Sequence, residues 1–171
     1  ESIRAQLAGA GLRVRLDEDD SQTPGWKFAE YEMRGVPLRL EIGPKDIEKQ
    51  SVFAARRDTR AKQSLPMAGL VESVRALLDE IQAELLERAR TFRDERTASA
   101  DTWEEFTRLM EGRPGFVIAP WCGSAACEAA IKAETQATIR NIPFGYEQPP
   151  GKPCVRCDQL ATVRAWFAKA Y

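Results

Sequence analysis

The sequence predicts an α/β protein built from two small domains, residues 1–96 and 97–171. Short stretches with the alternating pattern of β-strands are interleaved with stretches of helical spacing, which is typical of sheets flanked by helices. A long amphipathic helical pattern over residues 67–96 separates the two parts, and all four cysteines lie beyond it. A helix of this length in a globular protein indicates a connection between domains.

We expect a mixed sheet in the first domain. Its best-defined strand, at 36–42, places apolar residues on one face and Arg39 and Glu41 on the other. Because the chain opens with a helix, which should follow a strand, the first strand of the domain is expected to be missing from this sequence. The predicted elements are a helix at 1–8, a strand at 12–16, an acidic loop at 17–25, a short helix at 26–34, the strand at 36–42, a turn or brief helix at 44–50, a strand at 51–57, a charged turn at 58–62 and the long helix at 67–96.

The second domain is expected to be a small α/β unit. Asp101 is predicted to cap its first helix, with Glu104 completing a capping box. The unit is too small for a large apolar core, so a bound metal would help to stabilise it. The elements predicted after this helix are a strand at 116–119, a helix at 125–135, a strand at 138–144, a loop at 148–153 and a strand at 161–167.

Composition excludes several classes of protein. The net charge of −1 gives no global basic field, so any contact with nucleic acid must be local. The chain has no histidine, which excludes a Ser-His-Asp or Cys-His active site within it. No apolar run approaches the ~20 residues needed to cross a bilayer, and the first residues do not resemble a signal peptide.

The cysteines are spaced as two close pairs. Cys122 and Cys127 form C-x4-C, and after 26 residues Cys154 and Cys157 form C-x2-C. Two such pairs separated by a loop are the usual way to present four thiolates to one tetrahedral Zn²⁺. Two disulfides, free thiols or a redox-active C-x2-C pair are the alternatives. We favour zinc, since a redox motif does not need the second pair.

Residues 25–46, GWKFAEYEMRGVPLRLEIGPKD, mix aromatic, basic and acidic side chains at a density that packing alone does not require. This segment resembles the anticodon-binding domain of prolyl-tRNA synthetases of the archaeal/eukaryotic-like type, which also occurs in some bacteria. Leu16-Asp17 before it, Arg56-Arg57-Asp58-Thr59 after it, the cysteine quartet and the ending WFAKAY support the resemblance, which runs over essentially the whole chain. Nothing in the sequence resembles the three catalytic motifs of class II synthetases.

The resemblance implies a class IIa anticodon-binding fold for residues 1–96 and a C-terminal zinc-binding domain for 97–171. It also implies that the first domain grips the anticodon of proline tRNA, whose second and third letters are G. Carboxylates can accept from the N1 and N2 donors of guanine, cationic groups can reach O6, and an aromatic ring can carry an unstacked base. Residues 26–62 hold nine lysines and arginines against six acidic residues, a modest local surplus. The implied anticodon-binding residues are Phe28, Glu32, Arg39, Lys45, Asp46 and Lys62.

Each of these residues also has a structural interpretation. Trp26 and Phe28 are also what an amphipathic helix would bury, and Glu32 with Arg39 would also form an ordinary surface ion pair. Phosphate contact by Arg56 or Arg57 is a weaker hypothesis. The family places the terminal carboxylate, here that of Tyr171, near the catalytic pocket of the full enzyme.

The implied cofactor of this chain is structural Zn²⁺, with ATP and Mg²⁺ used only by the missing catalytic domain. The implied partners are proline tRNA and the chain's own catalytic domain, in a cytoplasmic, homodimeric proline–tRNA ligase that binds neither membrane nor DNA. By itself the chain is expected to be inactive. The alternatives are an independent zinc-stabilised module that binds RNA or protein, and a thiol–disulfide protein that uses Cys154 and Cys157.

Overall fold

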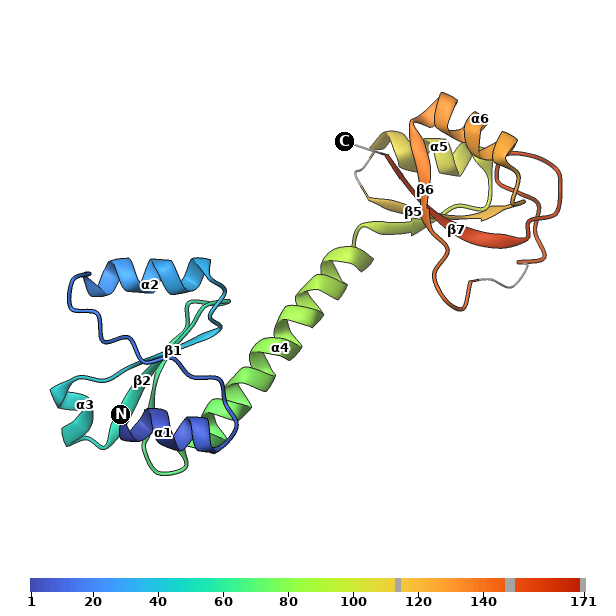
Figure 1. The fold of residues 1–171 in the computed structure, drawn as a ribbon. Helices are drawn as coiled ribbons and strands as arrows, with labels where there is room; N and C mark the ends of the chain where they lie inside the picture. The colour runs from blue at the N-terminus through green and yellow to red at the C-terminus, as the bar shows by residue number, and fades with distance from the viewer. Residues whose placement is uncertain (113–114, 147–149, 170–171) are drawn as a thin grey trace. The chain divides into compact units, whose positions relative to one another are not determined.

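The structure is a computed structural model that describes residues 1–112, 115–146 and 150–169. The chain divides into two compact units, of which the first is Glu1–Glu87 and the second begins at Arg88. Each unit contains one sheet with helices packed against it, which confirms the α/β fold class (Figure 1). Among the described residues, no helix is long and apolar enough to cross a membrane.

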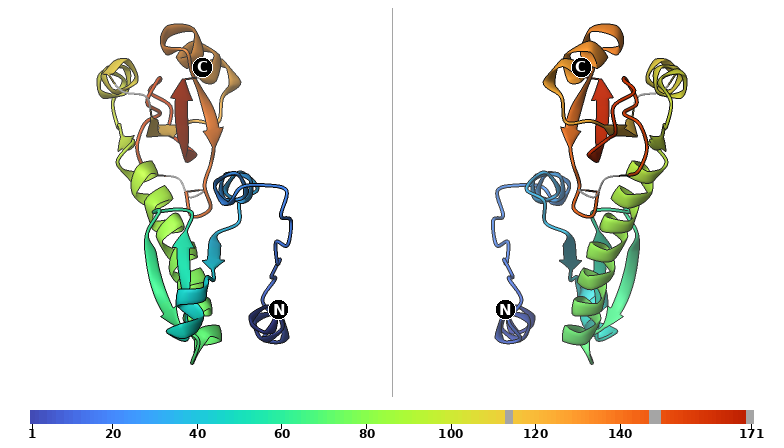
Figure 2. Two further views of the ribbon diagram at one scale, coloured as in Figure 1. Left: turned by 90° about the vertical axis from the view of Figure 1, so that its left-hand side faces the viewer. Right: turned by 90° about the vertical axis from the view of Figure 1, so that its right-hand side faces the viewer.

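The sheet of the first unit has the order β1-β2-β3, and both of its pairings are antiparallel. Its register places Arg39 opposite Ala55 and Ala55 opposite Lys62. Helices α2 and α3 lie at opposite ends of β1 (Figures 1 and 2). The elements are α1 (Ser2–Gly9), α2 (Pro24–Met33), β1 (Leu38–Glu41), α3 (Pro44–Glu48), β2 (Ser51–Arg56), β3 (Lys62–Pro66) and α4 (Leu70–Asp94).

One face of this sheet forms the core of the unit. Leu7 of α1 and three residues of α4 pack against buried side chains of β2 and β3. Leu38 and Leu40 of β1 pack against the same cluster, which confirms the face predicted for them. Arg39 and Glu41 therefore point to the opposite face, where α2 lies. The buried cluster consists of Leu7, Val52, Ala54, Leu65, Leu70, Val74 and Leu77.

Helix α2 begins and ends where its sequence requires. The Thr23 hydroxyl accepts a hydrogen bond from the Trp26 N–H at 3.4 Å, and Pro24 fills the first turn, where no donor is needed. After the helix, Gly35 adopts a φ of +83°, a left-handed conformation that glycine takes at little cost. Trp26 is 52% exposed and Phe28 half-buried, so Trp26 is not a core residue.

Two strand predictions in the first unit were wrong. Residues 12–16 are extended, and Leu12 and Val14 pack on the core, but no described strand pairs with them. Alternation marked their buried face correctly, whereas a strand also requires a hydrogen-bonded neighbour. In addition, β3 was not predicted, because only one residue of its sequence, Leu65, is buried and the others are polar or exposed.

The second unit contains a mixed four-stranded sheet of order β4-β5-β7-β6, in which only the β4–β5 pairing of the described strands is parallel. Phe106 and Phe167, both fully buried, meet edge to face with their ring centres 5.2 Å apart. The elements are β4 (Thr97–Ser99), α5 (Trp103–Gly112), β5 (Phe116–Trp121), α6 (Ala125–Thr135), β6 (Ala137–Asn141) and β7 (Val163–Lys169).

The predicted cap of α5 was off by one residue. Thr102, and not Asp101, accepts from a first-turn N–H, that of Glu105, at 3.3 Å. The Glu105 carboxylate in turn accepts from the N–H of Asp101 at 3.2 Å. The carboxylate of Asp101 instead pairs with Lys152 and, at 2.5 Å, with Arg164. These two cations lower the pKa of Asp101, chiefly through the hydrogen bond from Lys152.

Candidate functional site

Three residues form one row across the first sheet, on the face opposite the core. Arg39 and Lys62 flank Ala55 in this row, and two strand spacings separate them by about 10 Å. Because Ala55 is small, it leaves room between the two cations. A small surface pocket lies on this face. Its lining consists of Phe28, Tyr31, Glu32, Val36, Arg39, Ala55 and Arg57.

The guanidinium of Arg39 is held by three neighbours. Its Cζ atom lies 3.7 Å from the centre of the Phe28 ring. Its Nε donates to Glu41 at 2.9 Å, and its Nη1 donates to Glu32 at 3.3 Å. The Arg39 side chain is 19% exposed, so these contacts are partly shielded from water. Phe28, Glu32 and Arg39, three of the six residues predicted to bind the anticodon, therefore meet at one place.

A further residue of this cluster, Arg60, was missed. It comes from the turn between β2 and β3, and its Nη1 donates to Glu32 Oε2. Glu32 thus accepts from Arg39 on one oxygen and from Arg60 on the other. The sequence showed only that the turn at 58–62 is charged, which does not distinguish Arg60 from its neighbours.

Lys45 and Asp46 lie apart from this cluster, in α3 at the other end of β1. Asp46 Oδ2 accepts a hydrogen bond from the Gly43 N–H at 2.9 Å, so this carboxylate helps to begin the helix. Lys45 is exposed beside it. Of the six predicted residues, three therefore line the pocket, Lys62 lies in the same row of the sheet as Arg39, and two lie at α3.

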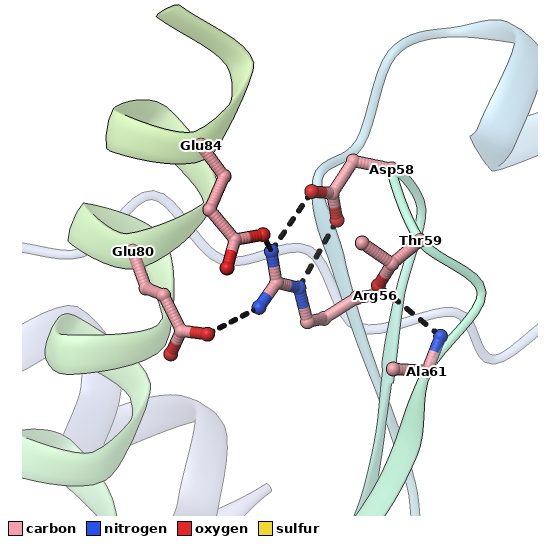
Figure 3. Close-up of polar contacts among 6 residues, drawn as sticks. All are labelled: Arg56, Asp58, Thr59, Ala61, Glu80 and Glu84. Carbon is pink, nitrogen blue, oxygen red and sulfur yellow. Dashed lines mark hydrogen bonds and ion pairs between the residues drawn. The ribbon is translucent and has the colours of Figure 1, made fainter. Parts of the chain in front are cut away.

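Arg56 occupies a buried structural position, shown in Figure 3. Its Nη1 donates to Glu80 at 2.7 Å and its Nη2 to Glu84 at 2.5 Å, both on α4. Its Nε and Nη2 also donate to Asp58, at 3.1 and 2.8 Å. The hydrogen bond with Asp58 raises the pKa of Arg56 and lowers that of Asp58. Arg56 is therefore not available to bind phosphate.

Arg57 points the other way from Arg56 and lines the pocket. Its Nε is buried and has no hydrogen-bond partner among the described residues. A ligand oxygen in the pocket would supply such a partner.

The four cysteines converge on one point of the second unit. Cys122 follows β5, Cys127 lies in the first turn of α6, and Cys154 and Cys157 belong to the loop before β7. Their sulfur atoms all lie within 4.8 Å of one another, and those of Cys122 and Cys157 are 3.9 Å apart. All four are free thiols. This arrangement differs from the two separate bonded pairs that disulfides would need.

Backbone hydrogen bonds hold the two cysteine segments together. The Val155 N–H donates to the Pro120 carbonyl, and the Thr162 N–H donates to the Trp121 carbonyl, each at 2.9 Å. Gly123 turns the chain between β5 and α6 with a φ of +83°, and an added Cβ would lie 3.3 Å from the Thr162 hydroxyl. The loop therefore docks on the end of β5 and brings the second pair to the first.

The donor set fits a structural zinc ion. Tetrahedral Zn–S bonds of about 2.3 Å place sulfurs about 3.8 Å apart, close to the separations found here. Burial raises the pKa of Cys127 to about 12 and also raises that of Cys122. Burial opposes ionisation of Cys154 as well, but backbone N–H groups, including that of Arg156, outweigh it and lower its pKa. Four sulfur donors can hold a metal and leave no open position for water.

The cations near this site have partners of their own. Lys152 pairs with Asp101, while Arg156 donates to Glu134 at 2.5 Å and lies 5.0 Å from the centre of the Trp103 ring. Tyr171, whose carboxylate was expected near the catalytic pocket of the full enzyme, lies outside the described residues.

Two family models match the chain. The one described as "Anticodon binding domain" matches residues 1–77, and the one described as "Prolyl-tRNA synthetase, C-terminal" matches residues 103–171. The chain is 47% identical to a proline–tRNA ligase of Acetoanaerobium sticklandii over 169 residues, 99% of this chain. It is 45% identical to proline–tRNA ligase 2 of Clostridioides difficile and 47% identical to a proline–tRNA ligase of Rubrobacter xylanophilus, over its whole length in both cases.

The chain spans 35% of the length of each of these relatives. The matched residues lie in both units and include Phe28, Glu32 and Arg39 as well as the four cysteines. The chain therefore belongs to the prolyl-tRNA synthetase family, of which it carries the anticodon-binding domain and the C-terminal domain.

Proposed function

We propose that this chain is the tRNA-recognition part of a proline–tRNA ligase, and that its first unit binds the anticodon loop of proline tRNA. The main support for the proposal is a contact between three side chains on one face of the sheet. The Arg39 guanidinium lies against the Phe28 ring and donates to the Glu32 carboxylate. The match of this unit to an anticodon-binding domain supports it.

The chemistry of this cluster suits an unpaired guanine. The Glu32 carboxylate accepts from the N1 and N2 donors, and Arg39 or Lys62 donates to O6. The aromatic ring of Phe28, which lines the pocket, offers a surface on which the unpaired base can stack. Lys45 and Asp46 offer the same pair of chemical groups at the other end of β1, so the two groups of residues serve the two guanines of the anticodon.

In the complete enzyme, a catalytic domain outside this sequence uses ATP and Mg²⁺ to attach proline to the tRNA. That enzyme is cytoplasmic and homodimeric in this proposal, and the present chain acts with its own catalytic domain. Zn²⁺ bound by Cys122, Cys127, Cys154 and Cys157 would hold the second unit together without taking part in the reaction.

The proposal is tested by binding of the 171-residue chain to an anticodon stem-loop of proline tRNA. Replacing either guanine by inosine, which lacks the N2 donor, should weaken binding about 5-fold or more, since one good base contact is worth ~1–3 kcal/mol. Glu32→Gln and Arg39→Ala should weaken binding by a similar factor and abolish discrimination at one of the two bases.

Glu30→Gln is the matched control for Glu32→Gln. Glu30 also lies on α2 and pairs with Arg34 at 2.6 Å, but it does not line the pocket. It should leave binding unchanged. Equal binding of stem-loops with unrelated anticodons would refute the proposed function.

A further inference from the structure

Arg60 has an unusual combination of backbone and exposure. Its φ is +64°, a left-handed conformation that costs a non-glycine residue free energy. Its side chain is 71% exposed, yet it donates to Glu32 on another element. A long exposed side chain is not held at such a place by burial, so its position depends on the turn that carries it.

The turn is linked to α4 through the buried side chain of Arg56. Asp58, 1% exposed, accepts from two nitrogens of Arg56, and Arg56 donates in turn to Glu80 and Glu84 (Figure 3). The Arg56 N–H also donates to the Ala61 carbonyl at 2.9 Å, which closes the turn. A relay of charged contacts therefore runs from α4 through Arg56 and Asp58 to the turn that presents Arg60 beside Glu32.

We propose that Arg60 is a further RNA-binding residue, which is the counter-ion of Glu32 in the free protein and binds a backbone phosphate in the complex. The phosphate is that of the nucleotide whose base Glu32 reads. Asp58 and Arg56 are positioning residues, because they fix the turn and do not touch the RNA. This inference rests on the proposed function, since it needs a base at Glu32.

The contacts of Arg39 and Arg60 indicate which of the two arginines releases Glu32 when a base binds. When a guanine edge takes the Glu32 carboxylate, one of the two arginines must give up its place. Arg39 is 19% exposed and keeps Glu41 and Phe28 as partners, whereas Arg60 is 71% exposed. The bound nucleotide brings its own phosphate, and a guanidinium matches phosphate with two parallel hydrogen bonds. Arg60 therefore exchanges a carboxylate for a phosphate, and Glu32 stays paired with Arg39.

The test compares Arg60→Ala with Arg34→Ala in the 171-residue chain, using the same anticodon stem-loop at several salt concentrations. Arg34 is a matched exposed arginine that caps the helix carrying Glu32 and pairs with Glu30. Arg60→Ala should weaken binding about 3- to 10-fold and reduce the slope of log K against log salt by about 0.7, the loss of one phosphate contact on a single strand. Its discrimination between guanine and inosine should be unchanged, and Arg34→Ala should alter neither quantity.

Three results would overturn the proposal. Tighter binding by Arg60→Ala would show that Arg60 only competes with the base for Glu32. An unchanged salt slope would show that Arg60 does not contact a phosphate. Loss of guanine discrimination would make Arg60 a base reader. If the unsubstituted chain itself does not discriminate anticodons, the proposed function fails and this inference fails with it, so the two failures are distinguishable.

The positioning role is tested by a double-mutant cycle. Asp58→Asn should lower affinity and salt slope in the presence of Arg60, but should have little further effect in Arg60→Ala. Additive losses would contradict the relay, because a general loss of stability weakens binding whether or not Arg60 is present. If Asp58→Asn does not fold, Glu84→Gln, whose wild-type side chain is 48% exposed, gives a milder break in the same relay.

Discussion

Replacing Arg56 by methionine should destabilise the first unit more than any exposed ion-pair change. Arg56 is 7% exposed and its main partner, Asp58, is 1% exposed. Methionine fills much of the same volume but removes the guanidinium that donates two hydrogen bonds to the buried Asp58 carboxylate. Breaking a buried pair from one side costs about 3–5 kcal/mol. The loss of the contacts to Glu80 and Glu84 adds little, because those side chains are 52% and 48% exposed.

The same substitution should weaken the effect of pH on stability. In the wild type Arg56 lowers the pKa of Asp58 below 3.8, so this pair stabilises the fold above that pH and its contribution is lost as pH falls through the lower folded pKa. In Arg56→Met, loss of the hydrogen bonds and charge of Arg56, the largest cause of the lowered pKa, should raise the folded pKa of Asp58. Mild acid then neutralises the buried charge, and the difference between variant and wild type should shrink as pH approaches 4.

The measurement is native-state hydrogen exchange of peptides that cover β2 and β3, in increasing urea, which reports the opening free energy of the first unit alone. Arg34→Met is the control, since Arg34 is 57% exposed and its pair with Glu30 is worth under ~1 kcal/mol. A loss for Arg56→Met no larger than that of the control would refute the argument that Asp58 depends on its buried partner.

Three further predictions concern the second unit. Chelation of zinc should cause a cooperative loss of hydrogen-exchange protection from about residue 115 onward, while the amides of β1–β3 stay protected. If these amides remain protected in metal-free, reduced protein, the metal is not structural. Cys154→Ser should lower the bound zinc below one ion per chain, whereas Ser124→Ala, which removes only a helix cap, should leave the metal content unchanged by elemental analysis. Gly115→Ala should lower the melting temperature, because its Cβ would lie 2.2 Å from the Arg96 carbonyl oxygen, at a cost of about 1–3 kcal/mol; Gly112→Ala, with nothing within 4 Å, should not.

Elements with strong local signals were predicted well from the sequence. Helix α6 was placed at its observed bounds, and α2 within two residues, because caps and apolar spacing fix helices locally. Strands depend on their neighbours, and this is where prediction failed. β3 carries a mostly polar, exposed sequence and exists because β2 offers hydrogen bonds, while residues 12–16 alternate well and pair with no described strand.

The candidate sites show the same difference between features set by local sequence and features set by distant neighbours. The cysteine spacing predicted a four-sulfur cluster, because short spacings within each pair constrain where sulfurs can lie. Spacing cannot place Arg60 beside Glu32, since the two are 28 residues apart and meet only through the register of β1, β2 and β3. Nor could it show that Arg56 is buried while Arg57 lines the pocket, because adjacent residues of a strand differ only in the face they occupy.

The pairing of charges on the first unit has a consequence for selectivity. Lys27 pairs with Asp17, Arg34 with Glu30, and Arg39 and Arg60 share Glu32, in a chain whose net charge is −1. A polyanion without the right bases competes with these carboxylates for the cations and meets little net positive charge, so it gains little. In the complex proposed above, a guanine edge replaces what it removes, since it donates to Glu32 while its phosphate accepts from Arg60. In that complex, the same pairs that weaken non-specific attraction would favour a ligand that supplies both a donor edge and an anion.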